Sequence, residues 1–177
     1  MTYGTGTPLK AVAGRLALDF VNTADWTPFD TVLKDRIASL ADLSAWTAGM
    51  GLPEAHWYGT LEALHDFRAG VRRAILGQGS LDLGFALPTP EQPFAQWLRR
   101  QALRDLVAAS ALSILADPRE LKRVKLCPGH DCGWLFLDET KNARRKWCLM
   151  EVCGNRAKSS RHYARTIGLE VETPTVR

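Results

Sequence analysis

The sequence contains no apolar run of about 18 residues or more, the length needed to cross a membrane. Residues 1–9 also lack the basic segment followed by an apolar segment that begins a secretory signal. We therefore expect the protein to be cytoplasmic and to have no membrane partner. In the reducing cytosol, closely spaced cysteines serve metal binding or redox chemistry more often than disulfides.

Motifs of common catalytic sites are absent as well. The chain has no GxSxG nucleophile elbow, no phosphate-binding P-loop and no HExxH motif. No histidine or carboxylate stands at a spacing typical of a catalytic pair with a nucleophile. We therefore predict that the protein is not an enzyme.

Acidic residues are scarce in the last third of the chain. The formal net charge of +4 over 177 residues is unevenly distributed, because residues 1–120 carry 11 Lys and Arg against 13 Asp and Glu, whereas residues 121–177 carry 12 against 6. Residues 141–165 contain eight cations and one acid, Glu151. Such a bias is typical of surfaces that bind phosphates, although a solvated charged face gives the same pattern.

Hydrophobic residues make up 46% of the chain, which is enough to bury a self-sufficient core. Their spacing predicts helices over residues 35–50, 53–76 and 94–116. Residues 15–22 fit a strand or the first turns of a helix equally well. Residues 77–93 are rich in Gly and Pro and are predicted to form a loop.

The pattern changes after Pro118. Short β-like runs at residues 123–127 and 134–137 flank the segment CPGHDCG, which predicts a hairpin whose turn carries two thiols. A last helix is predicted over residues 155–167, with Asn155 as its N-cap.

Cysteine is rare, and all four copies lie in this last third: Cys127, Cys132, Cys148 and Cys153. Their spacing is Cys-x4-Cys, fifteen residues, Cys-x4-Cys. Two thiol pairs on turns can converge on one tetrahedral Zn²⁺, and a redox dithiol pair or packed cysteines are the alternatives. Four cysteines close the coordination shell, so we expect one structural Zn²⁺ and read His130 as a turn residue.

Together these patterns predict a mainly α fold of the α+β class. Residues 1–119 are expected to form a helical N-terminal domain. Residues 120–177 are expected to form a small zinc-stapled β-hairpin followed by a C-terminal helix.

Cations and other polar side chains gather around the second thiol pair. At about 100° per residue, four of them share one face of the last helix, and the opposite face, with Ser160, Tyr163, Ala164 and Ile167, is expected to pack. The others occupy the segment between the thiol pairs, where they can follow a phosphate backbone. The residues predicted to bind nucleic acid are Lys141, Asn142, Arg144, Arg145, Lys146, Lys158, Arg161, His162 and Arg165.

Three further residues, Asp138, Trp147 and Arg156, are predicted to support the zinc module. Arg156 falls on the packing side of the last helix, where we expect it to bond with Asp138 or with a loop carbonyl. Trp134, Phe136 and Trp147 are expected to fill the core beside the metal rather than to stack on bases. A zinc-stapled fold still needs apolar burial.

The N-terminal part contains one candidate effector site, formed by Asp19, Asn22 and Arg68. Arg68 falls within the apolar stripe of the helix predicted over residues 53–76, and a buried arginine must be paired. Asp19 is the expected partner. A structural salt bridge and a binding site for a small acidic effector are both compatible with this pattern.

Residues 127–165, CPGHDCGWLFLDETKNARRKWCLMEVCGNRAKSSRHYAR, closely resemble the CGNR zinc-finger family of bacterial proteins. Leu149 stands where that family more usually has serine. Residues 16–23, LALDFVNT, resemble the opening of the ABATE domain that usually precedes this finger. The resemblance implies a bacterial transcription regulator that responds to stress and binds DNA through its finger.

We therefore predict a zinc-finger DNA-binding transcription regulator whose N-terminal domain responds to a small-molecule or stress signal. The alternative is an RNA-binding or protein-interaction module with a structural zinc, because zinc-stapled basic folds also bind RNA. A homodimer formed through the helical domain fits the prediction, since DNA sites often mirror protein two-fold symmetry.

Overall fold

The computed structural model describes residues 11–80 and 102–166. The elements, in chain order, are α1 (Leu16–Val21), β1 (Ala24–Trp26), β2 (Val32–Asp35), α2 (Leu40–Gly49), α3 (Leu61–Ile75), α5 (Leu103–Ala116), α6 (Pro118–Leu121), β3 (Val124–Leu126), β4 (Leu135–Leu137), the π-helical turn η1 (Met150–Gly154) and α7 (Asn155–Thr166). The predicted class, mainly α with a small hairpin and a C-terminal helix, is confirmed.

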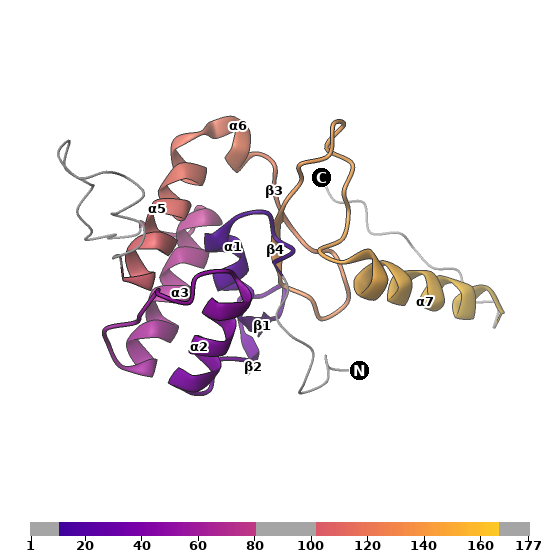
Figure 1. Ribbon diagram of the computed structural model, residues 1–177. Coiled ribbons are helices and arrows are strands. Elements are labelled where there is room, and N and C mark those ends of the chain that lie inside the picture. Colours follow the sequence, from indigo (N-terminus) through magenta and orange to yellow (C-terminus); the bar gives the residue numbers. More distant parts are fainter. Residues whose placement is uncertain (1–10, 81–101, 167–177) are drawn as a thin grey trace.

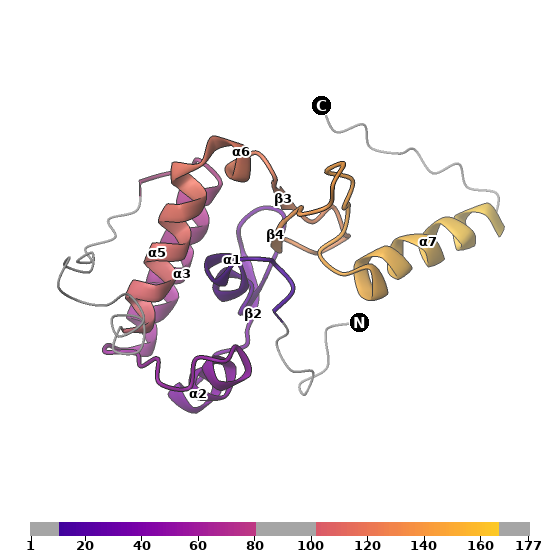
Figure 2. The same cartoon turned by 45° about the horizontal axis from the view of Figure 1, so that its top comes forward.

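The described residues form two parts, which we call the helical body, residues 11–80 and 102–121, and the finger, residues 122–166. In the body, α3 and α5 run side by side and α1 packs against both (Figures 1 and 2). Strand β4 also packs on α1, so the β3–β4 hairpin lies between the body and the rest of the finger. Helix α7 extends away from the body in both views.

Two antiparallel hairpins make up the β-structure of the described residues. In the finger, β3 pairs with β4 in a register that places Val124 opposite Leu137 and Leu126 opposite Leu135. This is the hairpin predicted around CPGHDCG. In the body, β1 pairs with β2, and Ala24 lies opposite Asp35. This second hairpin was not predicted.

Helices α2 and α3 begin later than the apolar spacing predicts, because polar caps fix their starts. Ser39 accepts a hydrogen bond from the Asp42 amide and caps α2, while residues 32–35 belong to a strand. Thr60 accepts from the Ala63 amide and caps α3, so Pro53 lies in the preceding loop and not in the first turn. Residues 15–22 resolve as the short helix α1.

Part of the predicted helix over residues 94–116 lies outside the described residues, as does most of the predicted loop over residues 77–93. The described remainder of that helix is α5, which ends at Ala116 before Asp117 and Pro118. Within the described part of the chain, no helix combines the length and apolar character needed to cross a membrane.

The core is centred on α1. Leu18, Phe20 and Val21 are fully buried, and the Phe20 ring lies 5.8 Å from the Trp46 ring and 5.9 Å from the Phe67 ring between centroids. The same cluster continues into the finger, where it includes the residues Trp134, Leu135, Phe136 and all four cysteines. The predicted domain boundary at residue 119 stays a prediction, but one buried cluster contains residues from both sides of it.

Candidate metal centre and basic surface

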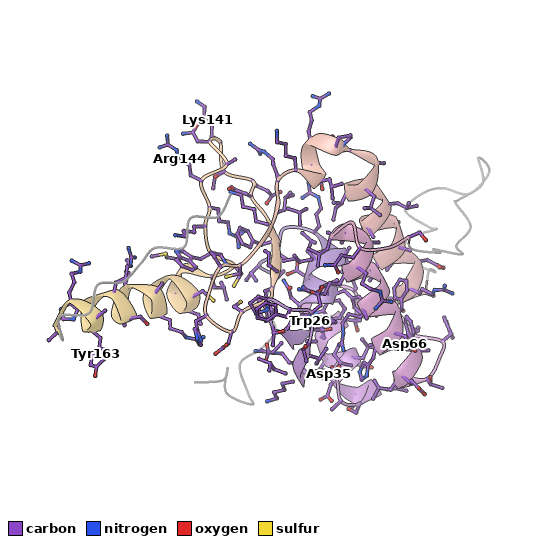
Figure 3. The ribbon with its side chains drawn as sticks, turned by 180° about the vertical axis from the view of Figure 1, so that it is seen from behind. Trp26, Asp35, Asp66, Lys141, Arg144 and Tyr163 are labelled. Atoms are coloured by element: carbon purple, nitrogen blue, oxygen red, sulfur yellow. The ribbon has the colours of Figure 1, made fainter. Side chains whose placement is uncertain are left out.

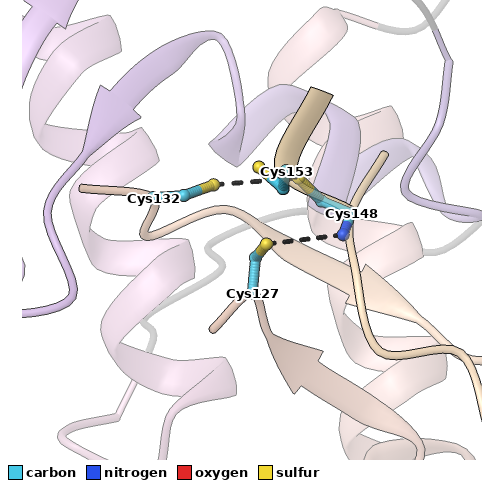
Figure 4. A group of neighbouring side chains, drawn as sticks. All are labelled: Cys127, Cys132, Cys148 and Cys153. Atoms are coloured by element: carbon cyan, nitrogen blue, oxygen red, sulfur yellow. Dashed lines mark hydrogen bonds between the residues drawn. The ribbon is translucent and has the colours of Figure 1, made fainter. Parts of the chain in front are cut away.

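The four cysteines converge from two places in the finger (Figure 4). Cys127 and Cys132 come from the β3–β4 turn, and Cys148 and Cys153 come from the segment that leads into α7. All four side chains are buried, and their sulfur atoms lie within 4.8 Å of one another. The Cys132 and Cys148 sulfurs are 3.7 Å apart, and those of Cys148 and Cys153 are 3.6 Å apart.

These distances fit a single tetrahedral metal ion. Zn–S bonds of about 2.3 Å place the sulfurs of a tetrahedral site about 3.8 Å apart. Four buried sulfurs complete such a shell. Few biological metals are bound by thiolates, and zinc is one of them. His130 lies outside the cluster, with its side chain 86% exposed and its Nδ1 2.6 Å from an Asp131 carboxylate oxygen.

Backbone geometry holds the first thiol pair in a tight turn. The Cys127 amide donates to the Trp134 carbonyl, and the Cys132 amide donates to the Gly129 carbonyl. A Cβ atom at Gly129 would lie 3.1 Å from the Cys153 sulfur and 3.2 Å from the Cys132 Cβ. A side chain at Gly129 would therefore push apart the atoms that converge on the site.

The crowding of four thiols changes their protonation. Side-chain hydrogen bonds from Cys132 and then Cys148 lower the pKa of the Cys127 thiol, and the Cys148 amide also donates to its sulfur, at 3.5 Å. The hydrogen bond to Cys127, followed by those to Cys132 and Cys153, raises the pKa of the Cys148 thiol. Because metals bind the thiolate form, a bound cation would displace the protons that the four thiols hold.

The helical body binds the end of the turn that carries Cys132, through hydrogen bonds to Gly133 and Leu135. The Gly133 amide donates to the Trp26 carbonyl at 2.7 Å, and Arg72 Nη1 donates to the Gly133 carbonyl at 2.6 Å. Asn22 binds Leu135 twice, since its Nδ2 donates to the carbonyl at 2.7 Å and its Oδ1 accepts from the amide at 3.0 Å. We call these contacts the clamp.

Arg72 is the buried centre of the clamp. Its Nε donates to an Asp30 carboxylate oxygen at 2.7 Å, and its guanidinium carbon lies 4.7 Å from the centre of the Trp26 ring. Burial lowers the pKa of Arg72, and the hydrogen bond that Arg72 donates to Asp30 offsets only part of this effect. Sequence reasoning missed Arg72, although it follows Arg68 by one helical turn and shares the buried face of α3.

Asp19, Asn22 and Arg68 do not form the predicted effector site. Asp19 accepts hydrogen bonds from the Val12 and Ala13 amides at 2.8 and 2.9 Å. Burial raises the pKa of Asp19, and the two hydrogen bonds, which lower it, offset only part of this effect. Asn22 belongs to the clamp. The predicted pair of Arg68 with Asp19 is therefore wrong.

Arg68 is instead held by residues in and next to the β1–β2 hairpin. Its two Nη atoms bind both Asp35 carboxylate oxygens, and Nη1 also donates to Thr23 Oγ1 at 3.1 Å. Asp35 lies at the end of β2, which brings it against α3. Of the two alternatives, the structural salt bridge is confirmed for Arg68, but its acidic partner is Asp35 and not Asp19.

Arg145 is turned inward. Its Nη2 donates to the carbonyls of Val12 at 2.8 Å and Cys148 at 2.6 Å. Its Nε donates to the Trp147 carbonyl at 3.1 Å, and its Nη1 donates to the Leu137 carbonyl at 3.3 Å. Because every nitrogen of the guanidinium is bound within the chain, the prediction that Arg145 binds nucleic acid is corrected. It joins the second thiol pair to the N-terminal segment of the body.

The remaining residues predicted to bind nucleic acid are exposed. Lys141 and Arg144 point outward from the tip of the segment between the thiol pairs (Figure 3). The other exposed members are Asn142, Lys146, Lys158, Arg161, His162 and Arg165. We call these eight residues the basic surface.

The opposite face of α7 does not pack as predicted. Tyr163 is 66% exposed and Ser160 is exposed, so only Ala164 is buried among the described residues of that face. Ile167 lies outside the described residues. Asn155 is not an N-cap, because η1 runs directly into α7 and the Asn155 side chain donates to the Glu151 carbonyl.

The predicted supporting residues take different partners. Asp138 is fully buried and accepts from Lys125 Nζ at 2.6 Å and from the Thr140 hydroxyl at 2.5 Å. Arg156 Nη1 donates to the His130 carbonyl at 3.4 Å, which is the loop-carbonyl contact predicted for it. Trp147 is half-buried against the core.

The pKa of Asp138 reflects a balance of burial and hydrogen bonding. Desolvation raises it, but the hydrogen bonds from Lys125 and Thr140 outweigh this effect and lower the pKa below its ordinary value. Lys125 Nζ also donates to the carbonyls of Ala143 and Arg145 at 2.7 and 3.1 Å. The buried carboxylate therefore anchors the start of the segment that carries Lys141 and Arg144.

Two families match the chain. Residues 123–166 match the family described as CGNR zinc finger. Residues 14–126, more than half of the chain, match ABATE, described as "Putative stress-induced transcription regulator". The chain belongs to the ABATE family. No curated protein matches it.

The family matches show what the clamp connects. Asn22 and Arg72 belong to the ABATE part, whereas Gly133 and Leu135 belong to the CGNR zinc finger. The two matches meet at β3, where the body passes into the finger. The ABATE part therefore holds the first thiol pair of the zinc finger directly.

Proposed function

We propose that this ABATE-family protein is a DNA-binding transcription regulator whose finger is held by one structural Zn²⁺. Cys127, Cys132, Cys148 and Cys153 would hold the ion, and the buried closed shell leaves no coordination position for a substrate. The ion would supply cross-linking of the two thiol pairs. We assign no enzymatic reaction to the chain.

The observation that carries the proposal is the projection of α7 away from the body with cations along it (Figure 1). Its twelve residues include four Lys and Arg and no acid. At about 1.5 Å per residue, such a helix is about 18 Å long, and with its side chains it is as wide as the major groove of B-DNA. An exposed basic helix on a rigid base is therefore shaped to enter that groove.

The segment that carries Lys141 and Arg144 supports the same interpretation. It forms a second exposed basic element, separate from α7 in space, and it is anchored by Asp138 and Lys125 (Figure 3). A protein that inserts a helix into a groove commonly fixes its position through phosphate contacts beside it. We propose that Lys141 and Arg144 make those contacts.

The test is the salt dependence of binding to random duplex DNA, measured by fluorescence anisotropy. We expect log K to fall steeply with log[salt], and each of Lys158→Gln, Arg161→Gln and Arg165→Gln to reduce the slope by about 0.9 if its cation contacts a phosphate. Arg73→Gln, an exposed cation on α3, is the matched control and should leave the slope unchanged. A flat salt dependence would contradict the proposal.

Structured RNA and a protein partner are outcomes of the same experiment. Stronger competition by structured RNA than by duplex DNA would favour an RNA-binding module, and the absence of binding to either would indicate a protein-docking module. The predicted cytoplasmic location and homodimer stay predictions. The response to a small molecule is proposed for the ABATE part, although not at Asp19, Asn22 and Arg68.

A further inference from the structure

A cavity of about 610 Å³ lies in the helical body where the loop before α3 meets α3 and the start of α5. Figure 3 places Asp66, one of its lining residues, on the side of the body away from α7. The cavity is therefore separate from the metal centre, the clamp and the basic surface. Its volume falls within the range of small-molecule sites, about 300–1,000 Å³.

One wall of the cavity is aromatic and is fixed in place. Trp57 Nε1 donates to the Thr60 carbonyl at 3.0 Å, and the Trp57 ring lies 5.9 Å from the Phe67 ring between centroids. A Cβ at Gly59 would lie 3.0 Å from Trp57 Nε1, so the glycine leaves room for the ring. Tyr58 completes the wall, and because it is 79% exposed its ring is accessible to a ligand.

The loop is also tied to the opposite wall. The Leu103 amide, at the start of α5, donates to the His56 carbonyl at 2.8 Å. This bond keeps the aromatic residues facing Arg104 and Asp105 across the cavity. The site is thus built before any ligand arrives, which lowers the entropy that binding would cost.

The charged residues of the lining are two carboxylates and one guanidinium. These residues are Asp66, Asp105 and Arg104, and Asp105 has an interaction partner of its own within the chain. Asp66 is exposed and has no ion-pair partner within the described part of the chain. Arg104 lies with its guanidinium carbon 5.5 Å from the centre of the Phe67 ring, so one aromatic face of this cavity already receives a cation.

We propose that this cavity binds a small organic cation, such as a quaternary or protonated amine. The Trp57 and Tyr58 rings would face its positive group, and Asp66 would neutralise the charge. Aromatic faces attract such cations, and one positive charge would balance the Asp66 carboxylate. The proposal specifies the ligand class for the small-molecule response under Proposed function, and it rests on that function for its biological role only.

The experiment is isothermal titration of the zinc-loaded full chain, without nucleic acid, with choline and with 3,3-dimethylbutan-1-ol, its neutral analogue of the same shape. We expect choline to bind about tenfold more tightly, which is the factor that cation–π and carboxylate contacts together supply. Asp66→Asn should remove most of this preference. Glu62→Gln, an exposed acid one turn earlier on α3 that does not line the cavity, should keep it.

A second pair of variants tests the aromatic wall. Tyr58→Ala should weaken choline binding about fivefold, whereas Phe29→Ala, an exposed aromatic between β1 and β2, should not. Equal binding of choline and the alcohol, no binding of either, or equal effects of Asp66→Asn and Glu62→Gln would overturn the proposal. Since no nucleic acid is present, these outcomes are independent of whether the finger binds DNA.

Discussion

The two halves of the finger are held in different ways. The half that carries Cys127 and Cys132 is bonded to the helical body through Asn22, Trp26 and Arg72. The half that carries Cys148, Cys153 and α7 reaches the body mainly through Arg145, and α7 itself projects away from it (Figure 2). The first half is therefore positioned by protein contacts, whereas we expect the second half to need a bound metal ion to fix its orientation.

Removal of the metal should produce the largest difference in stability between the second half of the finger and the rest of the protein. Structural zinc contributes on the order of 10 kcal/mol to modules of this size. We expect a chelator to expose the amides of residues 141–166 to hydrogen exchange while the amides of α1, α3 and α5 remain protected. Hydrogen exchange measured by mass spectrometry checks this, and equal loss of protection in both regions would contradict it.

Arg72→Met should be the most damaging single change in the clamp. It keeps most of the side-chain volume but leaves Asp30 and the Gly133 carbonyl without their cation, and since Asp30 is partly exposed we expect a cost below the roughly 3–5 kcal/mol of a fully buried pair. We expect a lower free energy of unfolding in urea and weaker zinc binding. Arg73→Met, at the exposed neighbouring position, is the control and should change neither quantity measurably.

Arg145→Met should act mainly on the second half. Four backbone carbonyls lose their donor, and hydrogen bonds to charged groups are worth about 1.5–3 kcal/mol. We expect faster hydrogen exchange around Cys148 and little change around Cys127. Arg144→Met, the exposed neighbour, should leave exchange as it is. An identical effect of both variants would show that Arg145 has no structural role.

Asp138 should produce a smaller, pH-dependent effect. Its pKa is lowered in the folded protein, so its stabilising contribution is complete above the unfolded pKa of about 3.9 and is lost as the pH falls through the folded pKa. Asp138→Asn should therefore cost about 1–2 kcal/mol near neutral pH.

This difference should shrink below about pH 4. Urea unfolding of both proteins across pH 3–7 checks it, because comparison with the variant cancels the effect of acid on the thiols. A difference that stayed constant down to about pH 3 would contradict the assignment.

Spacing in the sequence was enough to predict the metal centre and its hairpin, because the two cysteine pairs and the β-like runs are local patterns. The clamp was beyond such reasoning. Asp35 was assigned to the start of a helix, so the hairpin that brings it to Arg68 was missed, and Asp19 was chosen as partner instead. Without that hairpin, Asp30 and Trp26 could not be placed beside Arg72.

Arg145 shows that charge alone does not predict which side chains of an irregular segment are exposed. It lies in the run Arg144, Arg145 and Lys146, and no periodicity there distinguishes an inward side chain from an outward one. Its neighbour Arg144 is exposed, yet Arg145 binds four carbonyls. For α7 the periodic pattern correctly predicted the exposed cations, but tertiary packing, which spacing does not determine, left Tyr163 exposed as well.

The most direct test of the account is duplex DNA binding by one preparation before chelation, after chelation and after zinc is restored. If the metal fixes the orientation of α7 relative to the clamped half, affinity should fall at least about tenfold on chelation and return on addition of Zn²⁺, with the helical body folded throughout. Unchanged DNA affinity in the metal-free protein would contradict the account, because α7 would then be positioned without the metal centre.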